Sequence, residues 1–95
     1  MDFEFYRNFI TVAETGNLTT ASKKLALAQP ALSAQIKTLE HYYGAKLIQT
    51  ARGKRQLTLT EAGEAFLGKA RQICRTEETI LLDMQSFNKK ASGTL

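Results

Sequence analysis

The sequence predicts a mainly α-helical domain that carries one short β-hairpin and ends in a long helix. Three observations support this fold class. Apolar residues recur at helical spacing in three segments before residue 44, two short β-type runs flank a basic, turn-forming segment, and a heptad stripe follows residue 60. A chain of 95 residues is long enough for one domain with a hydrophobic core of its own.

The first two predicted helices are short and are joined by a tight turn. The first covers residues 3–15 and ends at Gly16, which is free to take a left-handed conformation. The second opens after Asn17, whose side-chain oxygen can accept a hydrogen bond from an unpaired backbone N–H. The apolar stripes are Phe5, Phe9 and Val12 in the first helix, and Leu18, Ala21 and Leu25 in the second.

The third predicted helix follows a short connection at residues 26–28, carries Pro30 in its first turn and ends at Gly44. Its apolar stripe is Leu32, Ile36 and Leu39. The other face is nearly bare, because it offers only Pro30, Ser33, Ala34 and Lys37. A face turned only to water usually carries more Glu and Lys pairs. This bare face indicates close approach to another molecule, and a plain solvated face is the alternative.

The remaining residues predict a hairpin and a long helix. The runs "KLIQT" and "QLTLT" flank the basic turn "ARGKR", which is typical of a β-hairpin with a charged tip. Thr60 can cap the fourth helix, with Glu61 and Glu64 near its positive end. The heptad stripe of this helix consists of Phe66, Ala70, Ile73, Glu77, Ile80, Met84 and Phe87, and Leu67, Cys74 and Leu81 widen it.

Composition excludes several classes of protein. Hydrophobic residues make up 43% of the chain and charged residues 23%, and no apolar run approaches the length of a membrane span. The N-terminal "MDFEFYRNF" is acidic and aromatic, unlike a signal peptide. The single cysteine, Cys74, excludes an internal disulfide and fits a reducing compartment. We therefore expect a cytoplasmic protein with no membrane partner.

The second and third predicted helices, joined by a short connection and followed by a basic hairpin, predict a winged helix-turn-helix. The net charge of +4 is a modest bias toward anionic partners, but four cations are concentrated in "ARGKRQ" and the neighbouring Lys46. The second helix of such a pair enters the major groove of DNA and offers its N-terminal residues to base edges. A groove-facing helix has to be slim, which explains the bare face of the third helix.

Three groups of residues are predicted to contact double-stranded DNA. Gln29 can bond an adenine edge in two places, and small groups can meet a thymine methyl. The alternatives without DNA contact are that Gln29 caps the helix, that Pro30 only starts it, and that Lys37 is a solvated lysine. The predicted contacts are Gln29, Pro30, Ala31, Ser33, Ala34 and Lys37 on the third helix, Thr19, Thr20 and Lys23 on the second, and Arg52, Lys54 and Arg55 on the wing.

The segments "GNLTTASKKLALAQPALSAQIKTLEHYYGAKLI" and "LTLTEAGEAFL" resemble the N-terminal DNA-binding domain of LysR-type transcriptional regulators. The motifs Q-P-A-L-S, Q-I-x-x-L-E and L-T-E-A-G occur in order, and the resemblance covers essentially the whole chain. It implies a winged domain at residues 1–60, a linker helix for dimerisation at residues 61–90, and at 91–95 the start of a hinge to an absent effector-binding domain. It further implies a bacterial protein, associated with the nucleoid when bound to DNA.

The resemblance also implies partners. The linker helices are expected to pair antiparallel in a homodimer that binds a two-fold symmetric operator, with a tetramer in the full-length protein and a small-molecule effector bound only by the absent domain. Glu77 interrupts the seam, so we expect it at the edge or facing a partner cation such as Arg71 or Arg75. The expected seam residues are Phe66, Ala70, Ile73, Glu77, Ile80, Leu81, Met84 and Phe87.

Three positions depart from the family pattern. Ala28 stands where the family usually has the Ser that caps the third helix, which predicts a weaker cap. Ala34 stands where the family often has a DNA-contacting Arg, so that contact is not carried over. The segment between Leu47 and Arg52 is about two residues longer than the usual pattern, which leaves the register of the wing and the role of Thr50 open.

The sequence offers no catalytic or cofactor site. It contains no Ser or Cys with a nearby His partner, no paired carboxylates typical of a cleft and no phosphate-binding glycine loop. His41 lacks partners at metal-ligand spacing, and Cys74 fits a small buried hydrophobe better than a redox sensor. We expect no enzyme, no cofactor and no metal. The rival from another class is a protein-interaction module that uses the same fold only to dimerise.

Overall fold

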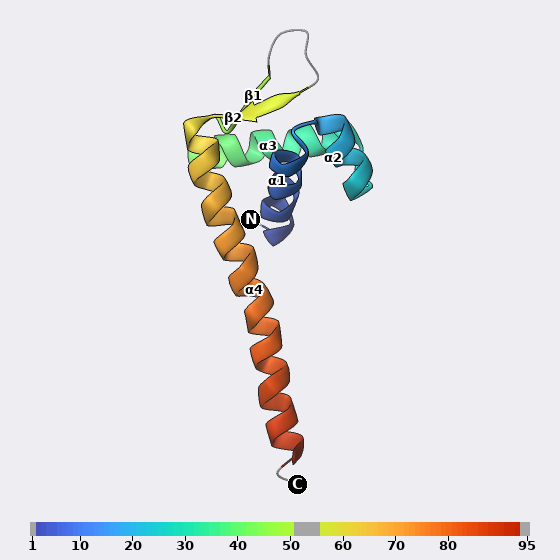
Figure 1. The fold of residues 1–95 in the computed structure, drawn as a ribbon, viewed down its shortest axis with the longest axis vertical. Helices are drawn as coiled ribbons and strands as arrows, with labels where there is room; N and C mark the ends of the chain where they lie inside the picture. The colour runs from blue at the N-terminus through green and yellow to red at the C-terminus, as the bar shows by residue number, and fades with distance from the viewer. Residues whose placement is uncertain (1, 51–55, 94–95) are drawn as a thin grey trace.

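The computed structural model describes residues 2–50 and 56–93, with the side chains of the last helix placed through residue 89. The fold class is confirmed: a helical body carries a two-stranded hairpin, and a long helix extends from it (Figure 1). The elements are α1 (Phe3–Thr15), α2 (Leu18–Leu25), α3 (Gln29–Tyr43), β1 (Ile48–Thr50), β2 (Leu57–Leu59) and α4 (Glu61–Gly93).

Local signals in the sequence set the helix ends. Gly16 and Gly44 end α1 and α3 with φ angles of 65° and 69°, in the left-handed region. The Asn17 side chain accepts a hydrogen bond from the backbone N–H of Thr20, and the Thr60 hydroxyl accepts one from Gly63 N–H at 2.9 Å. These ends were all predicted, because each depends on neighbours within four residues.

The core lies where α1, α2 and α3 meet beneath the hairpin. Its largest fully buried side chains are Phe9, Val12, Leu32, Ile36, Leu39 and Leu47. The α3 stripe is thus wholly buried, and Ala21 of α2 is buried beside it. Burying three aliphatic side chains on one helix stabilises its position by several kcal/mol, since each contributes roughly 1.5–3 kcal/mol. This packing fixes the rotation of α3 about its own axis.

The hairpin is attached to the body at both ends. Its strands pair antiparallel, with Ile48 opposite Leu59 and Thr50 opposite Leu57. The backbone N–H of Leu57 donates to the carbonyl of Gly16 at 2.9 Å, which ties β2 to the turn between α1 and α2. At the other end, Thr60 N–H donates to the Leu47 carbonyl at 3.0 Å. The hairpin therefore cannot move as a free arm at its base.

An aromatic cluster joins the first half of α4 to the body. The ring of Phe66 lies 4.9 Å from that of Phe9 in an edge-to-face arrangement, and 5.3 Å from that of Tyr43 at the end of α3. Tyr6 stacks on the same ring at 5.9 Å, and its hydroxyl lies 2.5 Å from the Tyr43 hydroxyl. This hydrogen bond, and then burial, raise the pKa of Tyr43 above its ordinary value. Phe66 thus contacts both α1 and α3.

The heptad stripe of α4 divides into two parts. Phe66, Ala70 and Ile73 pack against the body of their own chain, together with Cys74. Beyond Glu77 the stripe is uncovered: Ile80, Leu81, Met84 and Phe87 are 53%, 59%, 52% and 63% exposed. Heptad spacing alone does not distinguish a partner in the same chain from a partner helix. Contact of the first three residues with a second chain therefore stays a prediction, and their shown role is in the core.

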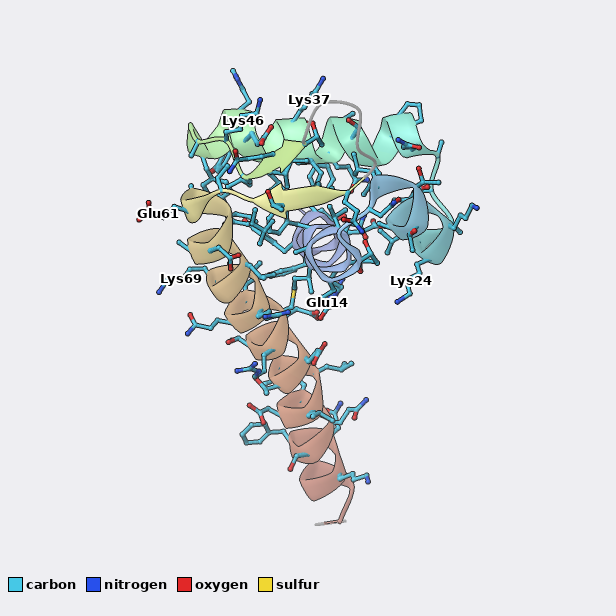
Figure 2. The ribbon with its side chains drawn as sticks, turned by 45° about the horizontal axis from the view of Figure 1, so that its top comes forward. Glu14, Lys24, Lys37, Lys46, Glu61 and Lys69 are labelled. Carbon is cyan, nitrogen blue, oxygen red and sulfur yellow. The ribbon has the colours of Figure 1, made fainter. Side chains whose placement is uncertain are left out.

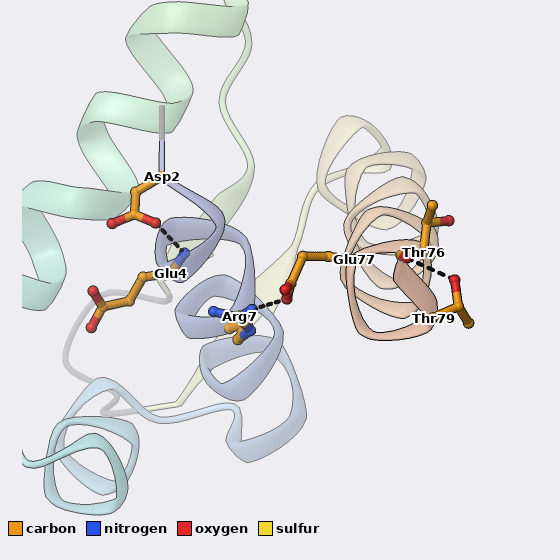
Figure 3. Close-up of polar contacts among 6 residues, drawn as sticks. All are labelled: Asp2, Glu4, Arg7, Thr76, Glu77 and Thr79. Carbon is orange, nitrogen blue, oxygen red and sulfur yellow. Dashed lines mark hydrogen bonds and ion pairs between the residues drawn. The ribbon is translucent and has the colours of Figure 1, made fainter. Parts of the chain in front are cut away.

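Glu77 has an ion-pair partner within its own chain. Its carboxylate pairs with Arg7 of α1 (Figure 3), and its predicted place at the edge of a dimer seam or opposite Arg71 or Arg75 of a partner chain stays a prediction. Arg71 pairs with Glu14 of α1 at 3.3 Å. Both pairs lie on the surface, so each contributes at most about 1 kcal/mol. They join α4 to α1 beyond the aromatic cluster.

The helical part of the chain also extends further than expected. The segment 91–93, predicted as the start of a hinge, continues α4 to Gly93. The residues at its end are small or polar, but they include no proline, and a glycine occurs only at the last helical position. Polar composition alone does not end a helix, because Lys and Ala are good helix formers.

We predict opposite effects from adding one methyl group at two glycines of α4. A Cβ atom at Gly63 would lie 2.0 Å from the carbonyl oxygen of Leu47, whereas one at Gly68 would have no neighbour within 4 Å. Gly63→Ala is therefore expected to lower the free energy of unfolding by roughly 1–3 kcal/mol. Gly68→Ala is expected to raise it by about 0.5–1 kcal/mol, because alanine favours a helix. Urea unfolding of both variants measures this, and a stable Gly63→Ala variant would contradict the close approach.

Candidate nucleic-acid interface

The outward face of α3 consists of residues on the side opposite its buried stripe. Pro30, Ala31, Ala34 and Lys37 are exposed, and Ser33 is half-buried. Pro30 lies in the first turn, where its missing N–H leaves no helical hydrogen bond unmade. Because these side chains are short, another molecule can come close to the helix backbone over its first two turns.

The N-termini of α2 and α3 are held together by side chains. The Thr19 hydroxyl donates to the Gln29 side-chain oxygen at 3.1 Å, so the structure brings together two of the predicted contact residues. Ala28, the N-cap residue of α3, makes no side-chain hydrogen bond, as its identity predicted. Gln29 is therefore anchored by α2, and its oxygen keeps a second lone pair for another donor. Thr20 and Lys23 are exposed on α2.

A groove of about 520 Å³ lies between α3 and the first strand of the hairpin. It brings Ser33 and Lys37 of α3 beside Lys46, just before β1, and beside Gln49 and Thr50. Lys37 and Lys46 project from the same side of the body, at the top of Figure 2, whereas Lys24 points away from it. The groove is lined by Leu18, Ser33, Ile36, Lys37, Glu40, Lys46, Ile48, Gln49 and Thr50.

Two groove residues were missed by the sequence analysis as functional candidates. Lys46 shares the groove with Lys37, and Glu40 is its only carboxylate among the described residues. Alternation about the buried Leu47 could have placed Lys46 on the outer face, since successive residues of an extended chain point to opposite sides. Nothing near Glu40 in the sequence indicated its contacts, which join segments that meet only in the fold.

A polar pair fixes α3 against α1. The buried amide of Asn8 donates to the side-chain oxygen of Gln35 at 2.7 Å. Throughout the part of the chain that the structure describes, no buried side-chain nitrogen or oxygen lacks a partner. The face that carries Ser33 and Lys37 is thus held by hydrogen bonds as well as by apolar packing.

Three of the predicted contact residues belong to the basic segment between the two strands. Arg52, Lys54 and Arg55, predicted to contact DNA, lie outside the described residues. The strands on either side of this segment, β1 and β2, are described. The assignment of these three cations to the interface stays a prediction.

The described residues point to no other kind of site. They contain no cluster of three or more His, Cys, Asp or Glu side chains placed to hold a metal ion. In the same residues, no helix is long and apolar enough to cross a membrane. Burial raises the pKa of the Cys74 thiol, with Arg7 acting in the opposite direction. A buried, protonated thiol is a poor nucleophile, which favours the reading of Cys74 as a core residue.

The fold and this face define a winged helix-turn-helix protein, and comparison with known proteins gives the family. A sequence model described as bacterial regulatory helix-turn-helix protein, lysR family, matches residues 3–64. The chain belongs to this family. It is 40% identical over all of its length to the HTH-type transcriptional regulator BsdA of Bacillus subtilis, and 42% identical over 86% of its length to the Hca operon transcriptional activator HcaR of Escherichia coli. Both relatives are named as regulators of transcription.

Solved structures agree with the fold. A crystal structure of the CbnR DBD in complex with DNA matches 90% of this chain with a TM-score of 0.84 and 35% identity, over 97% of its own length. The BenM DBD in complex with benA site 1 DNA matches 92% of this chain with a TM-score of 0.83 and 31% identity, over 99% of its length. The chain spans only 32% of the length of BsdA and 27% of that of HcaR.

The uncapped start of α3 gives a stability prediction. Ala28→Ser places a hydroxyl where it can accept from an unpaired N–H of the first turn, so the free energy of unfolding is expected to rise by about 1 kcal/mol. Ala34→Ser makes the same chemical change at an exposed position inside the helix, and it is expected to lower the value by about 0.5 kcal/mol or less. Thermal and urea unfolding measure both, and equal effects would show that α3 gains nothing from a cap.

Proposed function

We propose that this chain is the DNA-binding part of a transcriptional regulator and that it reads duplex DNA with α3 in the major groove. The observation that carries the proposal is the slim outward face of α3, flanked on one side by Lys37 and Lys46. The similarity of this chain to two domains solved in complex with DNA also supports the proposal.

The residues divide by what their chemistry can do at DNA. Gln29 and Ser33 carry donors and acceptors that can bond base edges, and Ala31 and Ala34 can meet a thymine methyl. The cations hold phosphates, which fixes the register of the helix on the duplex without reading sequence. We assign this second role to Lys37 and to Arg52, Lys54 and Arg55, and a weaker backbone role to Thr19, Thr20 and Lys23.

We further propose that α4 pairs two chains, so that the dimer binds a two-fold symmetric operator. The uncovered apolar residues between Ile80 and Phe87 support this, because soluble proteins rarely leave such a stripe in water. An apolar groove of about 420 Å³ beside the first half of α4, lined by Tyr43, Leu47 and Phe66 among others, supports it as well. Antiparallel pairing would bring the uncovered half of one α4 toward this groove of the partner.

The wider setting remains predicted from the family. A tetramer and a small-molecule effector stay predictions that rest on the family resemblance. A cytoplasmic location and association with the nucleoid likewise stay predictions.

Two arginine substitutions on α3 test groove reading. Ser33→Arg adds bulk to a half-buried position between α3 and the hairpin, so specific binding is expected to fall at least tenfold, within the range for losing a base contact. Ala34→Arg adds a cation at an exposed position, so binding is expected to strengthen and the slope of log affinity against log salt to steepen by about one. Titration against a duplex selected from a random pool measures both.

The outcomes separate the proposal from its rival. Equal behaviour of the two variants would show that the assigned face of α3 is wrong. A wild-type chain that shows no salt-dependent binding to any duplex would contradict DNA binding itself and favour the protein-interaction module. Circular dichroism of each variant confirms that a loss of binding is not a loss of fold.

A matched pair of α4 variants tests the dimer. Ile80→Asp with Met84→Asp places two charges on the uncovered stripe. The dissociation constant of the dimer is expected to rise at least a hundredfold, since burying an unpaired charge costs several kcal/mol. Leu82→Asp with Ser86→Asp makes a change of similar charge on the opposite side of the helix and is expected to have little effect. Ile73 is left unchanged, because it packs against the core.

Sedimentation velocity over a range of concentrations reads the result. A wild-type chain that stays monomeric at all concentrations, or a stripe variant that dimerises as well as the control, would overturn pairing through α4.

A further inference from the structure

The connection between α3 and β1 is organised around one residue, Glu40. Its backbone carbonyl accepts from the N–H groups of Gly44 and Ala45, the latter at 3.1 Å. Its carboxylate oxygen Oε2 accepts from Leu47 N–H at 2.8 Å and from Ile48 N–H at 3.4 Å. Four backbone N–H groups between the end of α3 and the start of β1 therefore donate to Glu40, two to its carbonyl and two to its carboxylate.

The carboxylate is directed at the backbone and not at the nearby cations. Lys37 and Lys46 line the same groove, yet no ion pair joins either of them to Glu40 in the described part of the chain. Hydrogen bonds to an ionised acceptor are roughly twice as strong as neutral ones. The hydrogen bonds of Glu40 therefore fix the position of β1 relative to α3. Its carboxylate does not serve to neutralise a lysine.

The same segment is held from the other side by the start of α4. The Thr60 hydroxyl donates to the Lys46 carbonyl at 2.6 Å, and the carbonyl of Leu47 approaches so closely that only glycine fits at position 63. Lys46 and Leu47 are thus held between α3 and α4. Of these two attachments, the one through Glu40 joins the strand directly to the helix that we propose enters the groove.

We propose that Glu40 is a positioning residue: it sets the place of β1 relative to α3, so that the predicted wing cations, which follow β1 in the sequence, reach phosphates while α3 lies in the groove. The inference rests on the proposed DNA-binding function and assigns no DNA contact to Glu40. The charge of Glu40 and its hydrogen bonds are expected to act in opposite directions on DNA binding. A carboxylate beside bound DNA repels phosphates, so its charge alone would weaken binding, whereas its hydrogen bonds are required for binding.

Two conservative variants separate reach from charge. Glu40→Asp keeps the charge but shortens the side chain by one methylene, so the carboxylate no longer reaches Leu47 N–H. Glu40→Gln removes the charge but keeps an oxygen acceptor at the same length. We expect duplex affinity to fall about tenfold in Glu40→Asp, the factor that corresponds to one charge-assisted hydrogen bond, and to stay within about threefold in Glu40→Gln. Glu14→Asp, at an exposed glutamate away from Lys37 and Lys46, is the control and is expected to bind as the wild type does.

Combination with the wing tip shows through what Glu40 acts. Replacing Arg52, Lys54 and Arg55 with alanine removes the proposed phosphate contacts and is expected to lower the salt slope by about one per lost contact. If Glu40 works by placing the hairpin, adding Glu40→Asp to this variant is expected to cause no further loss, because coupled residues are not additive. If Glu40 only stabilised the fold, the losses of affinity from Glu40→Asp and from the wing variant would multiply. The salt slope of Glu40→Asp alone would then equal that of the wild type.

The outcomes decide the inference separately from the function. Wild-type affinity in Glu40→Asp, a large gain or loss in Glu40→Gln, or multiplying effects in the combined variant would each overturn the positioning role while DNA binding stands. Absence of salt-dependent duplex binding by the wild type would instead refute the proposed function. Backbone hydrogen exchange gives a readout without DNA: in Glu40→Asp the amides of Leu47 and Ile48 are expected to exchange faster, while those of α1 do not change.

Discussion

The structure depends most on the complete burial of one stripe of α3. Leu32, Ile36 and Leu39 are enclosed by α1, α2 and the start of the hairpin. A helix whose stripe is buried on all sides cannot rotate about its axis without exposing apolar surface, at roughly 25 cal/mol for each Å². The direction of the opposite face is thereby fixed. Ser33 and Lys37 point outward because three other side chains point inward.

The aromatic cluster extends this constraint to α4. Phe66 contacts Phe9 of α1 and Tyr43 at the last turn of α3, so one ring touches both helices. The angle between α4 and α3 is therefore set inside each chain, before any pairing of chains. If two chains pair through the second half of α4, the distance between their two α3 helices follows from this angle. A two-fold symmetric DNA site requires such a fixed distance, since half-sites lie whole helical turns apart.

The sequence predicted the local features well and the long-range contacts poorly. Helix ends at Gly16, Gly44 and Thr60, and the missing cap at Ala28, depend on residues a few positions away, where propensity and spacing are informative. The partner of Glu77 lies 70 positions distant in Arg7, and nothing in a heptad pattern indicates it. For the same reason the pattern did not show that Phe66 and Ala70 pack within their own chain.

The candidate interface follows the same division. The slim face of α3 was predictable, because helical periodicity places Ser33, Ala34 and Lys37 opposite the apolar stripe. The addition of Lys46 to that face depends on where the hairpin returns over α3, and that return is set by the hydrogen bonds of Glu40 and Thr60. The two kinds of residue also differ in how freely they can vary. A substitution at exposed Ala34 changes the side chain that the helix presents and leaves the core intact, whereas one at Glu40 or Gly63 is expected to displace the segment of Lys46 and Leu47 that leads into β1. In this fold, therefore, side chains that read a surface can change independently of the side chains that hold them in place.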